Sequence, residues 1–319
     1  MEAKRWQQSC FESQGNPIPT SWMNFGHLNV SHQMQLVNNV FGIRGYANDN
    51  LKQCLYKNED EFGWTWQKGE TNPECLAPEG GCPAIPCYYQ MTFAGLNYGI
   101  WPSGQTSGIG ITDLPVNTGD LKSLVVSHDM TFEATDDLPG YHSRSNPVKP
   151  GKCYARHQLI YDLLLMSEKP EAGINKTKKI TDEIIIMLNY NYPYPDYETC
   201  NPKTGELGDT QSPAIEEDAV HDGCNNYHYH SFTDLDTPAD GHHTNYHQFR
   251  RLGGEIPGAP CAEAINLAPF FEYLKMRYDY ADWWLGQVLI GQNIYDHTHG
   301  KVTFHSLPMV EIVKKGNGE

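Results

Sequence analysis

The stretch that decides the fold most clearly is LKSLVVSHDMTFEA, residues 121–134. Larger apolar or aromatic side chains alternate in it with small or polar ones, which is the two-residue period of a strand with one buried face. The alternating positions are Leu124, Val126, His128, Met130 and Phe132. Three more β-rich runs are HQLIYDLLLMS (157–167), TDEIIIMLNYNY (181–192) and GKVTFHSLPMVEIV (300–313). Many strands without a βαβ rhythm predict an all-β sandwich.

One segment predicts a helix, INLAPFFEYLKMR at residues 265–277. Ile265 or Leu267 shares one helical face with Phe270, Phe271 and Leu274. Two polar stretches, about 69–87 and 192–247, look like loop insertions, and no linker divides the chain. We therefore expect a single domain over residues 1–319: a two-sheet β-jelly roll with one short helix and two insertions.

Charge narrows the class of partner. The chain has 23 basic and 39 acidic residues and a net charge of -16, which argues against nucleic acid and anionic membranes. Aromatic residues make up 12% of the chain and can stack on the apolar faces of sugars. We expect a monomer that binds a neutral polysaccharide or oligosaccharide.

Nine cysteines are present, several of them in segments rich in Pro and Gly, and none forms a C-x-x-C pair. This usage predicts an oxidised, secreted protein with about four disulfides and one spare thiol, not a four-cysteine zinc site. Two glycosylation sequons begin at Asn29 and Asn175. The first residues, MEAKRWQQSC, lack the apolar core of a signal peptide.

Five blocks, taken in order, resemble the family-twelve glycoside hydrolases. They are NNVFG (38–42) with Cys54 and the Trp64–Trp66 pair, IYDLLL (160–165), TDEIIIML (181–188), INLAPFFEYL (265–274) and VLIGQNIYDHTHGKVTF (288–304). The resemblance implies a jelly roll that holds a β-glucan chain. It also implies a disulfide between Cys10 and Cys54.

The resemblance places the nucleophile at Glu183 and a supporting carboxylate at Asp162. Strand alternation puts Glu183 on one face with Ile185 and Met187, and Asp182 on the other. If these two carboxylates are neighbours, their repulsion moves their pKa values apart, so that one stays ionised while the other is partly protonated. The plainer interpretations are that Glu183 is a surface charge at the end of a strand and that Asp162 makes a structural hydrogen bond.

Asn293 occupies the position where the family has its acid/base glutamate, and an amide cannot donate the proton. Three explanations stay open. Asp296, or a nearby histidine, acts as the acid; the protein binds sugar without cutting it; or the chain is an inactivated variant of an enzyme. An acid at Asp296 would widen the gap toward inverting geometry.

Several side chains are candidates for contact with substrate. Two of them replace tryptophans of the family with smaller apolar groups, Phe41 in NNVFG and Met187 on the nucleophile strand. The full set of substrate-binding candidates is Asn39, Phe41, Trp64, Trp66, Met187 and Tyr295, with Trp101 as a further aromatic platform. Each of the large aromatics could equally belong to the core.

His228 and His230, in NYHYHSF, would share one strand face and could chelate zinc or copper. Nearby aspartates could instead hold calcium, and a polar loop without metal is the simpler alternative. No cofactor is required by the proposed chemistry.

Three functions therefore compete. The first is an endo-acting hydrolase of a neutral β-glucan or xyloglucan, and the second is a non-catalytic carbohydrate-binding protein on the same fold. The third is a polysaccharide lyase that uses Tyr or His, and the net charge counts against its uronate substrates.

Overall fold

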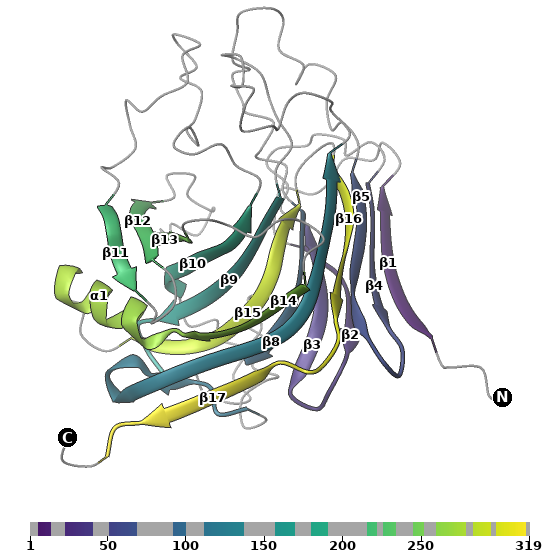
Figure 1. Cartoon of the computed structure of the whole chain (residues 1–319). Coiled ribbons are helices and arrows are strands. Elements are labelled where there is room, and N and C mark those ends of the chain that lie inside the picture. Colours follow the sequence, from purple (N-terminus) through teal and green to yellow (C-terminus); the bar gives the residue numbers. More distant parts are fainter. Residues whose placement is uncertain are drawn as a thin grey trace, which may run out of the picture.

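In a computed structural model, the chain forms two β-sheets packed face to face with one α-helix at their edge (Figure 1). The structure describes residues 6–13, 23–40, 51–68, 92–99, 112–136, 157–169, 180–190, 216–221, 226–233, 245–251, 260–278, 283–294 and 298–316. Within these residues, no helix is long and apolar enough to cross a membrane. The sheets and the helix confirm the predicted β-jelly-roll sandwich.

The smaller sheet has seven strands. In spatial order they are β1 (Gln7–Ser13), β4 (Leu51–Lys57), β5 (Phe62–Lys68), β16 (Thr298–Phe304), β8 (Leu121–Asp136) and β14 (Pro260–Asn266), and β17 (Met309–Lys314) also pairs with β8. β16 and β17 lie one after the other along the long strand β8, because β16 pairs with its residues 130–136 and β17 with residues 121–127.

The larger sheet has ten strands. In spatial order they are β11 (Glu216–His221), β12 (Asn226–Thr233), β13 (Asn245–Arg251), β10 (Ile180–Tyr190), β9 (His157–Met166), β15 (Trp284–Ile294), β6 (Thr92–Gly99), β3 (Met34–Val40) and β2 (Met23–Asn29), and the short β7 (Val116–Asn117) pairs with β15. A 3₁₀ turn, η4 (Thr118–Asp120), joins β7 to β8.

The core lies between the two sheets, and β8 contributes to it as the alternation predicts. Its five alternating side chains are at most 4% exposed. They meet apolar side chains of the larger sheet, among them Tyr161 and Ile184. The residues between them point outward and are half-buried or exposed.

The helix α1 (Ala268–Tyr278) buries Phe270, Phe271 and Leu274, as its sequence pattern predicts, and it buries Ala268 as well. Asn266, just before it, accepts hydrogen bonds from the backbone N–H groups of Ala268 and Leu124. One backbone N–H group at the start of the helix thereby has a hydrogen-bond partner, and the same side chain links the helix start to β8. Ile265, which the pattern allowed as a helical position, belongs to β14.

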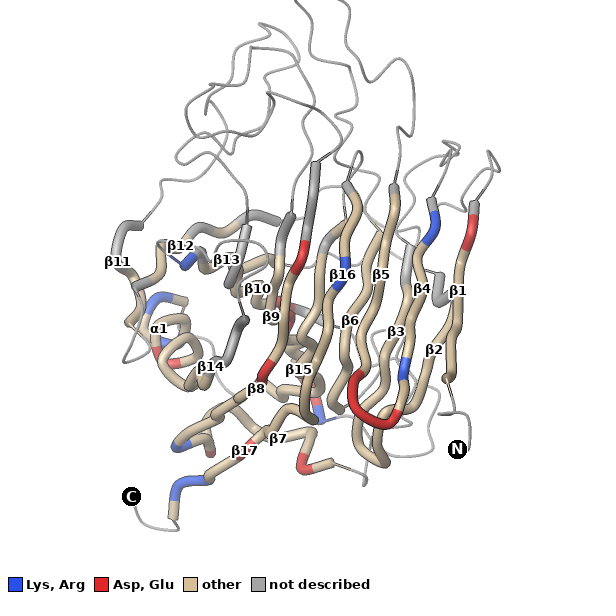
Figure 2. The backbone as a smooth tube through the Cα atoms, turned by 45° about the vertical axis from the view of Figure 1, so that its right-hand side comes forward, with Lys and Arg blue, Asp and Glu red and all other residues tan. Residues whose placement is uncertain are grey.

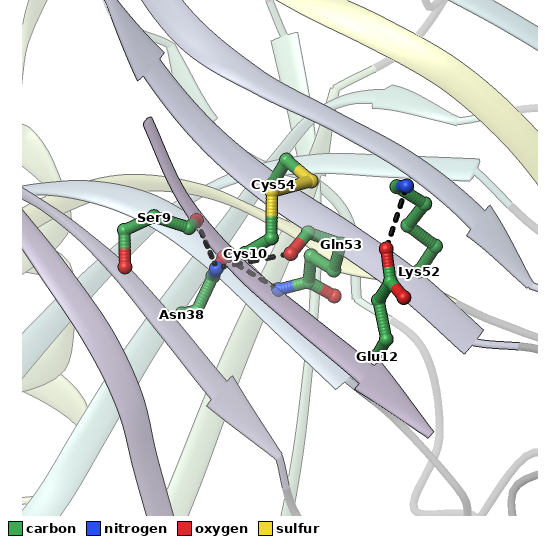
Figure 3. Close-up of a disulfide and its surroundings, with 7 residues drawn as sticks. All are labelled: Ser9, Cys10, Glu12, Asn38, Lys52, Gln53 and Cys54. Atoms are coloured by element: carbon green, nitrogen blue, oxygen red, sulfur yellow. Dashed lines mark hydrogen bonds and ion pairs between the residues drawn. A yellow bond between two sulfur atoms is a disulfide. The ribbon is translucent and has the colours of Figure 1, made fainter. Parts of the chain in front are cut away.

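The predicted disulfide between Cys10 and Cys54 is confirmed, and it joins directly paired residues of β1 and β4 (Figure 3). Beside it, the buried Gln53 side chain donates to Asn38 Oδ1 at 2.9 Å and to the Phe93 carbonyl at 2.7 Å. Because Gln53 lies on β4 whereas Asn38 and Phe93 lie on β3 and β6, these bonds fasten the two sheets together. Cys261 is in β14, and the other six cysteines lie outside the described residues.

The stretch 192–247 corrects one expectation. It contains β11, β12 and the start of β13, which extend the larger sheet by three strands instead of forming a loop. In β12 the strand alternation expected for NYHYHSF is observed, with Tyr227 and Tyr229 buried in the core. The 69–87 insertion lies outside the described residues.

Figure 2 shows where charge gathers in the described part, for instance at the acidic turn of residues 59–61 between β4 and β5.

Candidate functional site

Asp162 and Glu183 lie on neighbouring strands, β9 and β10, and on the same side of the larger sheet. Asp162 is paired with Ile185, and Glu183 with Leu164, so the two carboxylates are diagonal neighbours. Their side chains are hydrogen-bonded to each other, and both are half-buried. We call this side of the sheet the carboxylate face; it is opposite to the inter-sheet core.

Alternation along the two strands explains why the carboxylates share a face. In β10, Ile184 and Ile186 pack into the core, so Glu183 and Ile185 point the other way. In β9, Tyr161 and Leu163 are in the core, which turns Asp162 to the carboxylate face. The parity expected from the sequence is therefore observed.

Burial raises the pKa of Asp162 from 3.8 to about 7, although the hydrogen bond with Glu183 lowers it in part. Because two close carboxylates cannot both ionise at low cost, the pair holds one proton in the acid range and releases it near neutral pH. The proton is shared by the pair, and one carboxyl group donates a hydrogen bond to the other.

A second apolar cluster, separate from the core, surrounds the pair on the carboxylate face. It consists of Val37, Phe93, Ile160, Ile185, Met187 and Leu289, with Tyr246 packed against it. Gly95 and Gly291, which are directly paired, lie beneath the Phe93 ring, because a Cβ on either glycine would overlap it. Met187 is thus on the carboxylate face, where it is buried, and its contact with substrate stays a prediction.

Two buried amides lie on the same face, on the far side of Leu164 and Leu289 from the carboxylates. Gln287 is paired with Leu164, and Asn97 with Leu289. They are 1% and 5% exposed. Among the described residues, neither side-chain polar atom of Gln287 has a hydrogen-bond partner, nor does Oδ1 of Asn97. Neither amide was among the residues that the sequence patterns singled out.

The pairing of β15 separates Asn293 from Glu183. Asn293 is paired with Gln158, whereas Glu183 is level with Leu164, six residues along β9. At about 3.3 Å per residue this is roughly 20 Å along the strand. Glycosidase carboxyl pairs are about 5 to 10 Å apart, so this arrangement does not bring position 293 to Glu183.

Other candidates are placed away from the carboxylates or outside the described residues. Trp64 and Trp66 lie on β5 of the smaller sheet and are buried in the core, where Trp64 Nε1 donates to Gln292 Oε1 at 2.8 Å. They are therefore core residues and not platforms on the carboxylate face. The backbone of Asn39 pairs with Phe93, while Phe41, Trp101, Tyr295 and Asp296 are not among the described residues.

The two histidines predicted as metal ligands both lie on β12. His228 is buried at 6% exposure, and the side chain of His230 is outside the described part. Groups of three or more His, Cys, Asp or Glu that could hold a metal ion do not occur among the described residues. The metal site stays a prediction.

A polar network missed by sequence analysis lies on the opposite side of β10, within the core. Asp182 Oδ1 is 3.0 Å from His247 Nε2, and His247 Nδ1 is 2.9 Å from the Tyr229 hydroxyl. Tyr229 in turn contacts the Tyr278 hydroxyl at 2.6 Å. The network joins β10, β12 and β13 to α1. It also holds β10 to β13, which form the one parallel strand pair among those described.

Comparison with solved structures places the fold beside glycoside hydrolase family twelve. A family-twelve xyloglucanase from Bacillus licheniformis, solved with a ligand, matches with a TM-score of 0.58 at 15% identity over 92% of this chain and 99% of that one. A metagenome-derived family-twelve endoglucanase matches with a TM-score of 0.52 at 15% identity, over 98% of this chain and 100% of the other. No family model and no curated protein matches the sequence. The class that the fold defines is thus a glycoside-hydrolase-like jelly roll.

Proposed function

We propose that the protein is an endo-acting glycoside hydrolase that cleaves a neutral polysaccharide of the β-glucan or xyloglucan type. The observation that carries the proposal is the hydrogen-bonded pair of Asp162 and Glu183 on the carboxylate face. The likeness of the fold to xyloglucanases and endoglucanases supports it, as does the net charge of -16, which disfavours polyanionic glycans.

In this mechanism Glu183 acts as the nucleophile or the base, and Asp162 supports it. Asp162 donates a hydrogen bond that keeps Glu183 ionised and oriented. Because the two carboxyl groups touch, they are too close to serve as the two opposed groups of a glycosidase, which need at least about 5 Å between them. They therefore act as one unit, and a separate proton donor is required. The sequence suggests Asp296 or a neighbouring histidine for this role. Asn293, however, lies about 20 Å along the strand from Glu183, and Asp296 comes three residues after it, so we propose that the donor belongs to another segment.

The test is the release of new reducing ends from β-glucan and xyloglucan. We expect Glu183→Gln to lower kcat by at least about 10³-fold, because it removes the reacting carboxylate. Asp162→Asn should remove the ionisation near pH 7 from the pH–rate profile. Glu133→Gln, which changes an exposed carboxylate on β8, is the matched control and should leave kcat unchanged. A folded protein that releases no reducing ends from any neutral β-glycan would refute the proposal.

Replacement of Asp296 is a separate experiment. If the donor belongs to another segment, Asp296→Asn should leave kcat unchanged both for substrates with a poor leaving group and for activated aryl glycosides. A loss confined to substrates with a poor leaving group would show that Asp296 donates the proton, because an activated leaving group needs little protonation.

A second candidate function, a carbohydrate-binding protein without catalysis, is favoured by one observation. The residue at the family's acid/base position is an amide, and its backbone lies about 20 Å along the strand from Glu183. This function predicts glycan affinity with no turnover. Hydrolysis that disappears in Glu183→Gln would exclude it.

A further inference from the structure

The amide pair, Asn97 and Gln287, has no role in the proposed chemistry, yet it lies close to the carboxylates. Across one row of the sheet the order is Asn97 on β6, Leu289 on β15 and Asp162 on β9. Across the next row it is Gln287 on β15, Leu164 on β9 and Glu183 on β10. With strands about 4.8 Å apart, each amide is about 10 Å from a carboxylate, measured between Cα atoms.

Both side-chain polar atoms of Gln287 and Oδ1 of Asn97 are buried without hydrogen-bond partners among the described residues, which is costly for a folded protein. Native structures pair nearly all of their buried polar atoms, and an exception calls for an explanation such as a bound molecule. Gln287 and Asn97 are nine-tenths buried or more, and three of their polar atoms lack a partner within the described part of the chain. They are diagonal neighbours across β15 and β6, so one ligand group can reach both.

The chemistry of the patch indicates what that ligand is. An amide offers both donors and an acceptor without charge, which suits hydroxyl groups. Carboxylates and phosphates call for Arg or Lys, and the net charge of -16 disfavours them further. Leu289, in the apolar cluster of this face, lies between Asn97 and Asp162.

We propose that Asn97 and Gln287 form a subsite that binds the hydroxyl groups of a neutral sugar unit next to the carboxylate pair. The unit lies over β15 and β9, with its hydroxyls toward the amides and its glycosidic linkage toward Glu183. This inference rests on the proposed function for the position of the linkage, but the binding itself requires no catalysis. It assigns the preference for neutral sugars over uronates to these two side chains.

The experiment uses Gln287→Met and Asn97→Leu, which keep the volume and remove the polar atoms. Affinity for a neutral β-glucan or xyloglucan oligosaccharide is measured by calorimetry in the Glu183→Gln background, so that hydrolysis does not interfere. Loss of hydrogen bonds to a buried subsite should weaken binding about 5- to 100-fold for each variant. The melting temperature should stay unchanged or rise, because an unpaired buried amide has been replaced by an apolar group.

Gln292→Met is the matched control. Gln292 lies on the same strand, is fully buried on the core side, and accepts a hydrogen bond from Trp64. This variant should lower the melting temperature and leave the affinity unchanged. A structural role for Gln287 would make its variant behave in the same way.

Two results overturn the inference: amide variants that bind the oligosaccharide as tightly as the parent, or a parent that binds no neutral oligosaccharide. Failure of the proposed function is seen separately, in the reducing-end assay with intact Glu183. If that assay is negative while the amide variants still lose affinity, the subsite stands and the hydrolase proposal falls.

Discussion

Replacement of Asp162 by Asn tests the carboxylate pair through stability, without any substrate. The pKa of Asp162 is raised from 3.8 in the unfolded chain to about 7 in the folded protein. Each pKa unit is worth 1.36 kcal/mol, so the shift of about three units corresponds to about 4 kcal/mol.

The sign follows from which state holds the proton. Between about pH 4 and pH 7 the folded protein keeps a proton that the unfolded chain has released. The free energy of unfolding therefore falls as pH rises through this range, and the fall is complete above about pH 7. Asp162→Asn removes the titrating group, and the amide can still donate a hydrogen bond to Glu183. The variant should gain about 4 kcal/mol relative to the parent between pH 4 and pH 8.

The assay is urea denaturation of parent and variant at a series of pH values from 4 to 8. Subtracting the two curves removes the contribution of the other ionisable groups. Asp129→Asn, at an exposed position on β8, is the control and should follow the parent at every pH. If the stability difference between Asp162→Asn and the parent changes by less than about 1 kcal/mol over this range, the shared proton does not exist.

Three further predictions concern the scaffold. His247→Leu should lower the free energy of unfolding by about 3 to 5 kcal/mol in urea denaturation, because it leaves the buried carboxylate of Asp182 unpaired. If the double variant with Asp182→Asn loses as much stability as the two single variants added together, the pair is not coupled. Gly291→Ala should lower the free energy of unfolding by about 1 to 3 kcal/mol, because its Cβ overlaps the Phe93 ring. Adding Phe93→Leu to this variant should recover part of the loss, and a Gly291→Ala variant as stable as the parent would contradict the close approach. Replacing Cys10 and Cys54 together by Ser should lower the free energy of unfolding by about 4 kcal/mol, since the disulfide closes a separation of 44 residues; an unchanged midpoint of denaturation would count against that cross-link.

Some parts of the fold followed from local patterns. β8 was evident because one of its faces is buried and the other is not, so the period-two alternation survives in the sequence. The helix was evident from the spacing of Phe270, Phe271 and Leu274, all of which are buried. Opposite faces for Asp182 and Glu183 followed from the same alternation.

Other parts left no such signal. β6 is buried at all eight of its residues, so Phe93 and Asn97 sit in a run without alternation, and nothing local assigns either of them to a face. Gln287 and Gly291 are in the same situation on β15. Alternation in NYHYHSF indicated a local strand, but nothing local showed that β11 to β13 join the larger sheet, because polar histidines alternate there with the buried tyrosines.

The sequence by itself determined a β-sandwich with one helix, and it determined that Glu183 and Asp182 lie on opposite faces of one strand, because strand alternation is a local property. Only the tertiary structure decided what faces Glu183. The pairing register of β9, β10 and β15 brings Asp162 into contact with it and sets Gln287 level with it two strands away. Register depends on contacts between separate segments: the paired residues Ile185 and Asp162 are 23 apart in the sequence, and Leu289 and Asp162 are 127 apart. A shift along the strand moves every side chain that a given carboxylate can meet.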